Sequence, residues 1–233
     1  MRAVGVLLLL PGILAPQPST AEIHGSVLGA GRDLLHIARI ELRNGGLRRF
    51  AEAGAGAYDF RQLPPGIYDL TVSMDLYVPT IIRSVAIGPG QVRTLPPVAL
   101  IFEGIAAACG RRMPAFLRPL DTFDPGKGGL GGRIIDDHGQ PLADATVRLY
   151  IPNLNVAGAA LTDSSGRFFM EGIPAGPHYE IEVARTGFFT EDFSDFEVQA
   201  GYEAFYDRID LFPCEKGRCQ AALRPIRPLP ACG

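Results

Sequence analysis

Four histidines are the residues in this chain of 233 that are best suited to bind a metal ion or to move a proton. They are His24, His36, His138 and His178, and no two of them stand in an HxH or HExxH arrangement. A catalytic zinc site needs about three clustered protein ligands and an open coordination position. The histidines therefore predict no metal site.

Nucleophilic catalysis has no better support. No serine lies in a Gly-x-Ser-x-Gly sequence, so the sharp turn that exposes a catalytic serine is not predicted. Because metal ligands, a nucleophile motif and a cofactor motif are all missing from the sequence, we expect a protein that is not an enzyme. No catalytic residue and no cofactor are predicted.

An acidic cluster is the strongest candidate for a calcium site. It consists of Glu191, Asp192, Asp195 and Glu197. Carboxylate oxygens at such short spacing can hold Ca²⁺. A solvated loop explains the same residues, and we favour that interpretation.

Aromatic side chains near this cluster predict a binding surface. By register with Val85 and Ile87 of an earlier, similar segment, Phe196 and Val198 should point inward, while Phe189 should be exposed beside Tyr202 and Phe205. Exposed aromatic rings stack on sugars or dock a protein partner. The complete absence of tryptophan weakens a dedicated glycan-binding interpretation. The predicted binding residues are Phe189, Tyr202 and Phe205.

The composition indicates which elements hold these side chains. Gly 28 and Pro 20 supply many turns, and a hydrophobic content of 47% is sufficient for folded cores. Many short strands fit this composition better than long helices. The net charge of −3 and the lack of a basic block argue against nucleic acid as a partner.

Residues 1–21 have the pattern of a secretory signal peptide. Arg2 precedes an apolar run over residues 3–14, and small residues at Ser19 and Ala21 fit a cleavage site. The run is too short for a membrane span, and no later apolar stretch reaches the roughly 20 residues that a span needs. A buried N-terminal strand is the alternative. We expect export, with a soluble mature chain that is secreted or periplasmic.

The mature chain would keep four cysteines, which are Cys109, Cys214, Cys219 and Cys232. In an exported protein an even number predicts disulfides, here two bonds with three conceivable connectivities. We favour Cys214 with Cys219, because the four residues between them suit a turn, which leaves Cys109 with Cys232. A zinc site is the competing interpretation, but the sequence has no CxxC pair.

An internal repeat is the most informative feature of the chain. Residues 56–66 (GAYDFRQLPPG) recur as residues 166–176 (GRFFMEGIPAG), about 110 positions later. Further matches join residues 38–42 to 145–149, 68–72 to 179–183, 85–87 to 196–198 and 98–100 to 209–211. The repeat predicts one domain that has been duplicated.

The matched segments alternate apolar with polar residues, which is typical of strands with one buried face. In residues 179–183, for example, Tyr179, Ile181 and Val183 should face a core. Short strands at this spacing predict β-sandwiches. The predicted divisions are residues 22–103 for the first sandwich, 104–127 for a linker with Cys109, 128–212 for the second sandwich, and 213–233 for a Cys/Pro-rich tail.

Two details of the linker bear on the structure. Its end, residues 124–129 (DPGKGG), is rich in turn-forming residues. The sequence RPL occurs after the first sandwich at residues 118–120 and again after the second at 227–229. This echo predicts that each tail packs across its own sandwich.

The second copy resembles a known family. Residues 132–147 (GRIIDDHGQPLADATV), 162–168 (TDSSGRF) and 173–176 (IPAG) are similar to the motifs of a carboxypeptidase regulatory-like domain. The resemblance covers roughly residues 130–212. The motif residues are Gly132, Asp136, Gly139, Pro141, Ala145, Gly166, Phe168, Pro174 and Gly176.

This resemblance implies the details of the fold. It implies two tandem seven-stranded Greek-key sandwiches like transthyretin, often grouped with carbohydrate-binding-like folds. The first copy is a degenerate version, because residues 31–34 lack the Gly-x-Pro turn. The family carries no conserved catalytic set. An intradiol dioxygenase of similar opening motif needs two tyrosines and two paired histidines, and the histidine pair is missing.

The sequence therefore predicts an exported, non-catalytic structural or protein-interaction module of a bacterial cell envelope. Its expected partner is an envelope protein or a polysaccharide. A carbohydrate-binding module is the alternative, suggested by the fold group and by the aromatic segment around Phe189 and Tyr202.

Overall fold

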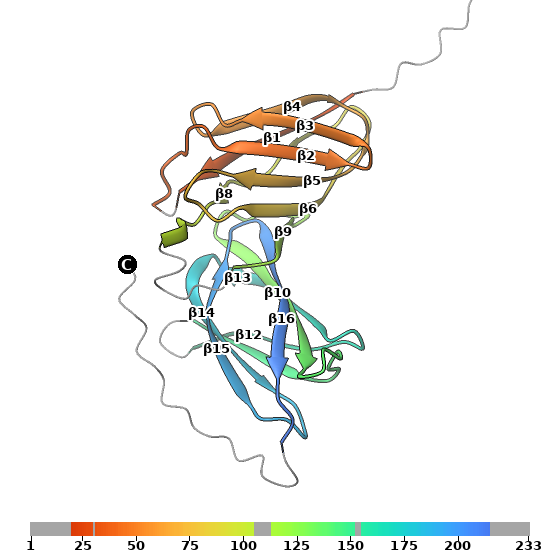
Figure 1. The fold of residues 1–233 in the computed structure, drawn as a ribbon, viewed down its shortest axis with the longest axis vertical. Helices are drawn as coiled ribbons and strands as arrows, with labels where there is room; N and C mark the ends of the chain where they lie inside the picture. The colour runs from red at the N-terminus through yellow and green to blue at the C-terminus, as the bar shows by residue number, and fades with distance from the viewer. Residues whose placement is uncertain (1–19, 30, 105–112, 152–154, 215–233) are drawn as a thin grey trace, which may run out of the picture.

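The computed structural model describes residues 20–29, 31–104, 113–151 and 155–214. Within these residues the fold is all-β, with the strands stacked as two sandwiches that follow one another along the chain (Figure 1). The predicted fold class is confirmed. The predicted signal peptide lies outside the described residues except for its last two, and Ala21 begins a strand in which it pairs with Leu63 of the neighbouring strand.

The first sandwich holds the strands up to Ala99. One layer contains β1 (Ala21–Leu28), β4 (Ala57–Leu63), β7 (Val92–Thr94) and β8 (Val98–Ala99). The other layer contains β2 (Arg39–Asn44), β3 (Leu47–Glu52), β5 (Gly66–Ser73) and β6 (Thr80–Ile87). Between β7 and β8, Pro96 and Pro97 have no amide hydrogen to donate, so the pairing with β1 is interrupted there.

The second sandwich begins at Lys127. One layer contains β10 (Lys127–Asp136), β13 (Arg167–Pro174) and β16 (Tyr202–Leu211). The other layer contains β11 (Thr146–Ile151), β12 (Asn155–Leu161), β14 (Gly176–Ala184) and β15 (Glu191–Val198). Seven strands build this sandwich, as the family resemblance implies.

The two sandwiches pair their strands in the same pattern. In the first, β1 pairs antiparallel with β4 and parallel with β7 and β8; in the second, β10 pairs antiparallel with β13 and parallel with β16. The other layers also agree, because β2 pairs with β3 and β5, and β11 pairs with β12 and β14. The pairs β5–β6 and β14–β15 complete the correspondence.

Backbone conformation repeats as well. Residues with positive φ occur in pairs about 110 positions apart, a conformation that L-residues adopt at a cost. The pairs are Gly56 with Gly166, Gln62 with Gly172, Leu76 with Gly187, Ser84 with Asp195, and Gly90 with Gly201. Non-glycine residues hold this conformation at three of these positions in the first sandwich. The left-handed positions therefore belong to the shared backbone rather than to glycine itself.

The core follows the predicted alternation. Tyr179, Ile181 and Val183 of β14 are buried, as expected from their spacing. The Tyr179 hydroxyl donates a hydrogen bond to the Pro174 carbonyl at 2.5 Å, and the Tyr68 hydroxyl of the first sandwich donates to the Pro64 carbonyl at 2.6 Å. Each buried tyrosine thus secures the turn that precedes its strand.

The family motif residues of the second sandwich build turns. The Asp136 carboxylate accepts hydrogen bonds from the backbone amides of His138 at 2.9 Å and Gln140 at 2.7 Å. Gly166 has φ +75, and a Cβ there would lie 2.4 Å from the Ile134 carbonyl oxygen. Only glycine combines that conformation with so close an approach. These motif residues thus shape the backbone of the sandwich.

A short strand that the sequence did not predict joins the sandwiches. β9 (Phe116–Pro119) lies in the predicted linker, pairs antiparallel with β16 over four residues, and pairs parallel with β6 through Ile82 and Leu117. It makes one eight-stranded sheet in the order β13-β10-β16-β9-β6-β5-β2-β3 (Figure 1). The predicted linker over residues 104–127 thus contains a strand that pairs with both sandwiches, over four residues with β16 and through one residue pair with β6.

The turn-rich segment before the second sandwich also differs from its prediction. Lys127, Gly128 and Gly129 belong to β10 and pair with β13. A Cβ on Gly128 would lie 2.2 Å from the Gln199 carbonyl oxygen, so the backbone approaches its neighbour more closely than a side chain allows. The glycines here mark tight packing inside a sheet rather than a flexible linker.

Two further observations concern the predicted compartment. Cys214 is disulfide-bonded, and the other three cysteines lie outside the described residues, so their connectivity stays a prediction. Over the described ranges, no helix is long and apolar enough to cross a membrane.

Candidate functional site

The predicted aromatic binding surface is wrong for two of its three residues. Tyr202 is 0% exposed and Phe205 is 4% exposed, so neither ring can stack on a ligand at the surface. β9 is their neighbour in the sheet, where Pro119 pairs with Tyr202 and Phe116 with Phe205, and the sequence places β9 in a linker. Phe189 is half-buried, and its amide donates a hydrogen bond to the Phe212 carbonyl beyond the end of β16. Phe189 therefore lies at the opposite end of β16 from Tyr202.

Tyr202 and Phe205 instead hold the sandwiches together. The Tyr202 hydroxyl donates a hydrogen bond to the Pro96 carbonyl of the first sandwich at 2.7 Å. The Phe205 ring stacks on Phe116 of β9, with ring centroids 4.7 Å apart. The Gln199 side-chain amide accepts a hydrogen bond from the Ala99 amide at 3.3 Å and donates one to the Ala99 carbonyl at 3.2 Å. These contacts define a packed joint between the domains.

A charged pair lies in the same joint. The Arg118 guanidinium of β9 contacts the Glu203 carboxylate of β16 at 2.8 Å. Burial raises the pKa of Glu203, and the charge of Arg118 only partly opposes that effect. The pair helps to set the register between β9 and β16, because Arg118 and Glu203 are direct neighbours in that ladder.

The acidic cluster does not form a metal site in the structure. The Asp195 carboxylate lies 3.2 Å from Nδ1 of the His178 ring. Glu191, Asp192 and Glu197 also interact with other residues. Among the described residues, no three His, Cys, Asp or Glu side chains are grouped closely enough to hold a metal ion.

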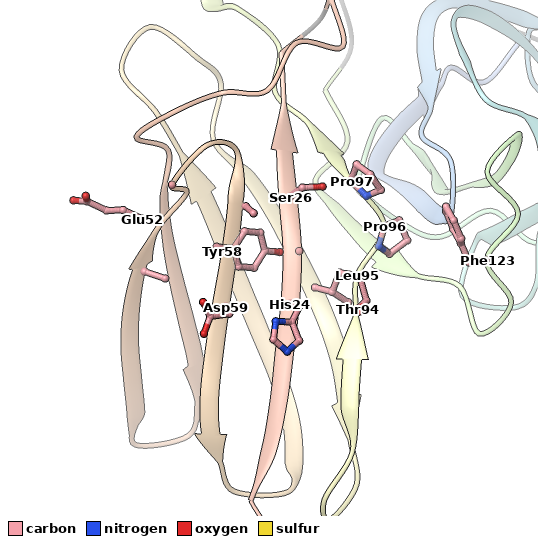
Figure 2. Close-up of a pocket in the computed structure, with 14 residues that line it drawn as sticks. His24, Ser26, Glu52, Tyr58, Asp59, Thr94, Leu95, Pro96, Pro97 and Phe123 are labelled. Carbon is pink, nitrogen blue, oxygen red and sulfur yellow. The ribbon is translucent and has the colours of Figure 1, made fainter.

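A cavity of about 870 Å³ beside the joint is the best-formed candidate site. It lies over β1 and β4 of the first sandwich and reaches across the β7–β8 connection to Phe123, which precedes the second sandwich (Figure 2). Its lining residues with functional side chains are His24, Ser26, Glu52, Tyr58, Asp59, Thr94 and Phe123. Glu52 points away from the others in Figure 2.

Tyr58 packs into the core of the first sandwich, on the opposite face of the sheet from the side chains of His24 and Ser26. The Tyr58 ring lies beneath Gly25, and a Cβ on that glycine would be 2.3 Å from the tyrosine hydroxyl oxygen. The hydroxyl is buried and has no hydrogen-bond partner among the described residues. Burial raises the pKa of Tyr58 well above its ordinary value, so the group stays protonated and can donate a hydrogen bond.

The walls are mixed in character. Phe123 packs one edge against Pro96 and Gly201, and the remainder of the side chain leaves it 55% exposed. Asp59 is paired with Arg61 at 2.9 Å, and the His24 ring contacts Glu22 at 3.1 Å. Asp59 and His24 thus each have a charged neighbour, and the hydroxyls of Ser26 and Thr94 also line the cavity.

The sequence predicts no functional role for any of these cavity residues, His24 included. One signal was present in the repeat, because Tyr58 stands where the second copy has Phe168. A polar group in place of an apolar one at a core position predicts an unusual environment. The exposure of Phe123 could not be predicted, since it depends on how the linker crosses the joint.

Comparison with known families finds a match within the second sandwich. Residues 129–207 match the model of the carboxypeptidase regulatory-like domain. The resemblance stated from the motifs is confirmed for this stretch. No curated protein sequence matches the chain.

Solved structures with similar folds are distant. The Bacillus anthracis TIE protein is 16% identical, with 84% of this chain and 34% of that chain covered and a TM-score of 0.33. The minor pilin GBS52 of Streptococcus agalactiae is 13% identical over 87% of this chain and 100% of its own, with a TM-score of 0.29. The 3-chlorocatechol 1,2-dioxygenase from Rhodococcus opacus 1CP is 17% identical over 45% of this chain and 65% of its own, with a TM-score of 0.32.

These likenesses carry no conclusion about activity or partners, because the TM-scores and identities are low. The chain spans about a third of the length of the TIE protein.

Proposed function

We propose that this chain is an exported, non-catalytic module of a bacterial cell envelope, with a structural or protein-interaction role. The observation that carries the proposal is the joint, in which β9 fuses two sandwiches into one sheet. Two domains that share a sheet and a buried core keep a fixed relative orientation. A fixed two-domain unit suits a spacer or a docking scaffold.

We further propose that the two sandwiches arose by duplication and that the first is a degenerate copy of the second. The repeated sequence segments, the equal pairing pattern and the paired positive-φ positions support this origin. Export is supported by the signal-peptide pattern of residues 1–21, and the disulfide framework by the even number of cysteines.

Export can be tested by expressing the full chain with a C-terminal tag and separating the cytoplasm from the exported fraction. The expected product is exported and begins at Glu22, as read by N-terminal sequencing. Its cysteines should resist alkylation until a reductant is added. A cytoplasmic product that starts at Met1 with four free thiols would remove the envelope role.

The structural role is tested by cross-linking the exported protein in intact cells and identifying what it captures. A recurrent envelope protein is the expected result. Hydrolase or oxidase activity in the purified mature protein would contradict the non-catalytic proposal.

Carbohydrate binding is the second candidate function. The aromatic residues that first suggested it are mostly buried, but the cavity over Gly25 offers hydroxyl groups beside an exposed ring. That arrangement is typical of sugar sites.

A further inference from the structure

Arginine side chains lie on two stacked aromatic rings at the joint between the sandwiches. Phe116 of β9 stacks on Phe205 of β16, with ring centroids 4.7 Å apart. The guanidinium carbons of Arg83 and Arg118 lie 4.7 and 5.6 Å from the Phe116 centroid. That of Arg167 lies 5.5 Å from the Phe205 centroid. These three arginines and two rings are called the arginine platform below.

The platform lies on the outer face of the eight-stranded sheet. Leu117 and Ala204 pair with each other and are buried in the core, so the residues on either side of them in β9 and β16 point outward. Arg83 follows Ile82, which is buried and pairs with Leu117. The three arginines come from β6, β9 and β13, which lie in the first sandwich, the joint and the second sandwich (Figure 1). The platform therefore exists only while the joint is formed.

A third aromatic ring borders the platform. A Cβ on Gly129 would lie 2.6 Å from the Phe169 ring, and one on Gly131 would lie 3.5 Å from it. A Cβ on Gly131 would also lie 2.7 Å from the Glu203 carboxylate. Because these glycines have no side chains, the Phe169 ring lies across β10 toward β16 and is 43% exposed. It adds an accessible apolar surface next to the charged groups.

The platform has more positive than negative charge. Glu203 is its one carboxylate and pairs with Arg118 at 2.8 Å. Within the ranges that the structure describes, Arg83 and Arg167 are exposed and form no ion pair. Arg133 and Glu171, which follow on the same face, add one charge of each sign. Two guanidinium groups thus stay without a carboxylate.

A second arginine cluster on the same face is different in this respect. Arg39 and Arg48 lie over the Phe50 ring at 4.4 and 4.9 Å, near the free edge of the sheet at β3. There the Glu41 carboxylate accepts hydrogen bonds from both Arg43 and Arg48. That cluster pairs two of its own arginines, whereas the platform leaves two unpaired.

The chemistry of the platform selects its partner. A guanidinium that stacks on a ring is held in place while its N–H groups stay free to bind a carboxylate in a bidentate manner. A sugar polymer would need hydroxyl or amide groups for its own hydroxyls, and the platform has none. Arginine and aromatic residues are the types that are enriched in interfaces between proteins.

We propose that the arginine platform docks an acidic segment of a partner protein. Carboxylates of the segment bind Arg83 and Arg167, and an apolar side chain of the segment packs on Phe169. The proposal rests on the protein-interaction role proposed above and specifies the surface that performs it. Because the platform spans both sandwiches, it also gives their fixed orientation a purpose.

The test uses the purified mature protein and a fluorescent peptide built from Glu-Glu-Leu-Gly repeats, with Gln-Gln-Leu-Gly repeats as its uncharged match. Binding is followed by fluorescence anisotropy. The acidic peptide should bind, more weakly as salt is added, and the uncharged peptide should not. A double variant, Arg83→Gln with Arg167→Gln, should weaken binding about tenfold, because two exposed charge-assisted contacts are lost. Phe169→Ala should weaken binding about threefold.

The matched control is the double variant Arg43→Gln with Arg48→Gln. It removes the same charge from the same face, but from arginines that already bind Glu41. It should leave peptide affinity unchanged, which separates the position of the arginines from net charge. Circular dichroism of each variant checks that the fold is intact.

A second arm repeats the cross-linking of intact cells with both double variants. The captured partner should be lost with Arg83→Gln and Arg167→Gln and kept with the control. Equal capture, or equal peptide binding, by all three proteins would leave the interaction role standing and overturn this surface. Tighter binding of polygalacturonate or polyphosphate than of the acidic peptide would overturn the choice of a protein partner. If no partner is captured at all, the proposed function fails and the docking surface fails with it.

Discussion

The first turns of the two sandwiches reach similar backbone conformations with different atoms. In the second sandwich Gly139 has φ 79, and the Asp136 side chain holds the turn through two backbone amides. In the first sandwich Arg32 has φ 63, and the turn is held by backbone hydrogen bonds between Gly29, Arg32 and Asp33. The fold therefore persists where the motif does not, because strand pairing and left-handed positions carry it.

The largest expected loss of stability comes from a substitution in the joint, because both sandwiches pack against β9 there. Leu117 is fully buried and pairs with both Ile82 and Ala204. Leu117→Ala should destabilise the protein by about 2 to 5 kcal/mol. Calorimetry should change from one unfolding transition to two. A single transition in the variant would mean that the joint does not couple the domains.

The next largest effect is the difference in stability between alanine substitutions at two equivalent turn glycines, one in each sandwich. Both Gly56 and Gly166 have positive φ, but a Cβ on Gly56 meets the side chain of Leu34, whereas one on Gly166 meets backbone at 2.4 Å. A side chain can move and the backbone of β10 cannot, so Gly166→Ala should be about 1 to 3 kcal/mol more destabilising than Gly56→Ala. Denaturant unfolding measures both, and equal losses would contradict this account.

Exchanging the aromatic residues sharpens the comparison further. Tyr58→Phe should stabilise the first sandwich by about 1 kcal/mol, because an unsatisfied hydroxyl is removed. Phe168→Tyr should destabilise the second by about 1 to 2 kcal/mol, because the ring already lies under Gly132. The double exchange serves as a check on additivity. Effects of the same sign would show that the two sites are not equivalent.

The smallest effect is a response to acid in the first sandwich. Hydrogen bonds from Arg43 and Arg48 lower the pKa of Glu41 to about 2 from its ordinary 4.5. Because the folded pKa is the lower one, this stabilisation is present above pH 4.5 and is lost as the pH falls toward 2. Glu41→Gln should flatten that part of the pH–stability curve, with the second sandwich as internal reference in amide NMR spectra. An unchanged pH–stability curve would show that the Glu41 interactions do not stabilise the fold.

What the sequence could predict follows from local rules. Alternation in segments such as Tyr179 to Val183 reports which face of a strand is buried, and the repeat of about 110 positions predicts two sandwiches of similar pattern. β9 escaped prediction because a short strand that only completes a sheet between domains has no alternation of its own. Tyr202 and Phe205 were misjudged for that same reason.

The glycines of β10 escaped prediction for a different reason. Glycine is common in linkers, but Gly128 and Gly129 are required by close approach of neighbouring strands, which a single sequence does not reveal. The cavity could not be predicted either, because its walls depend on the same segments. It opens where the β7–β8 connection, Phe123 and the start of the second sandwich meet, and none of these positions follows from local pattern.

The eight-stranded sheet also has a mechanical meaning. A load that reaches one sandwich passes to the other through the ladders of β9 as well as through the chain itself. To separate the domains, either the pairing of β9 with β6 at Ile82 and Leu117 or the four residue pairs between β9 and β16 must part, together with the buried contacts of Tyr202 and Gln199. The molecule should therefore bear tension as one body, and its extension under force should begin within a sandwich or at a terminus rather than by bending between the two.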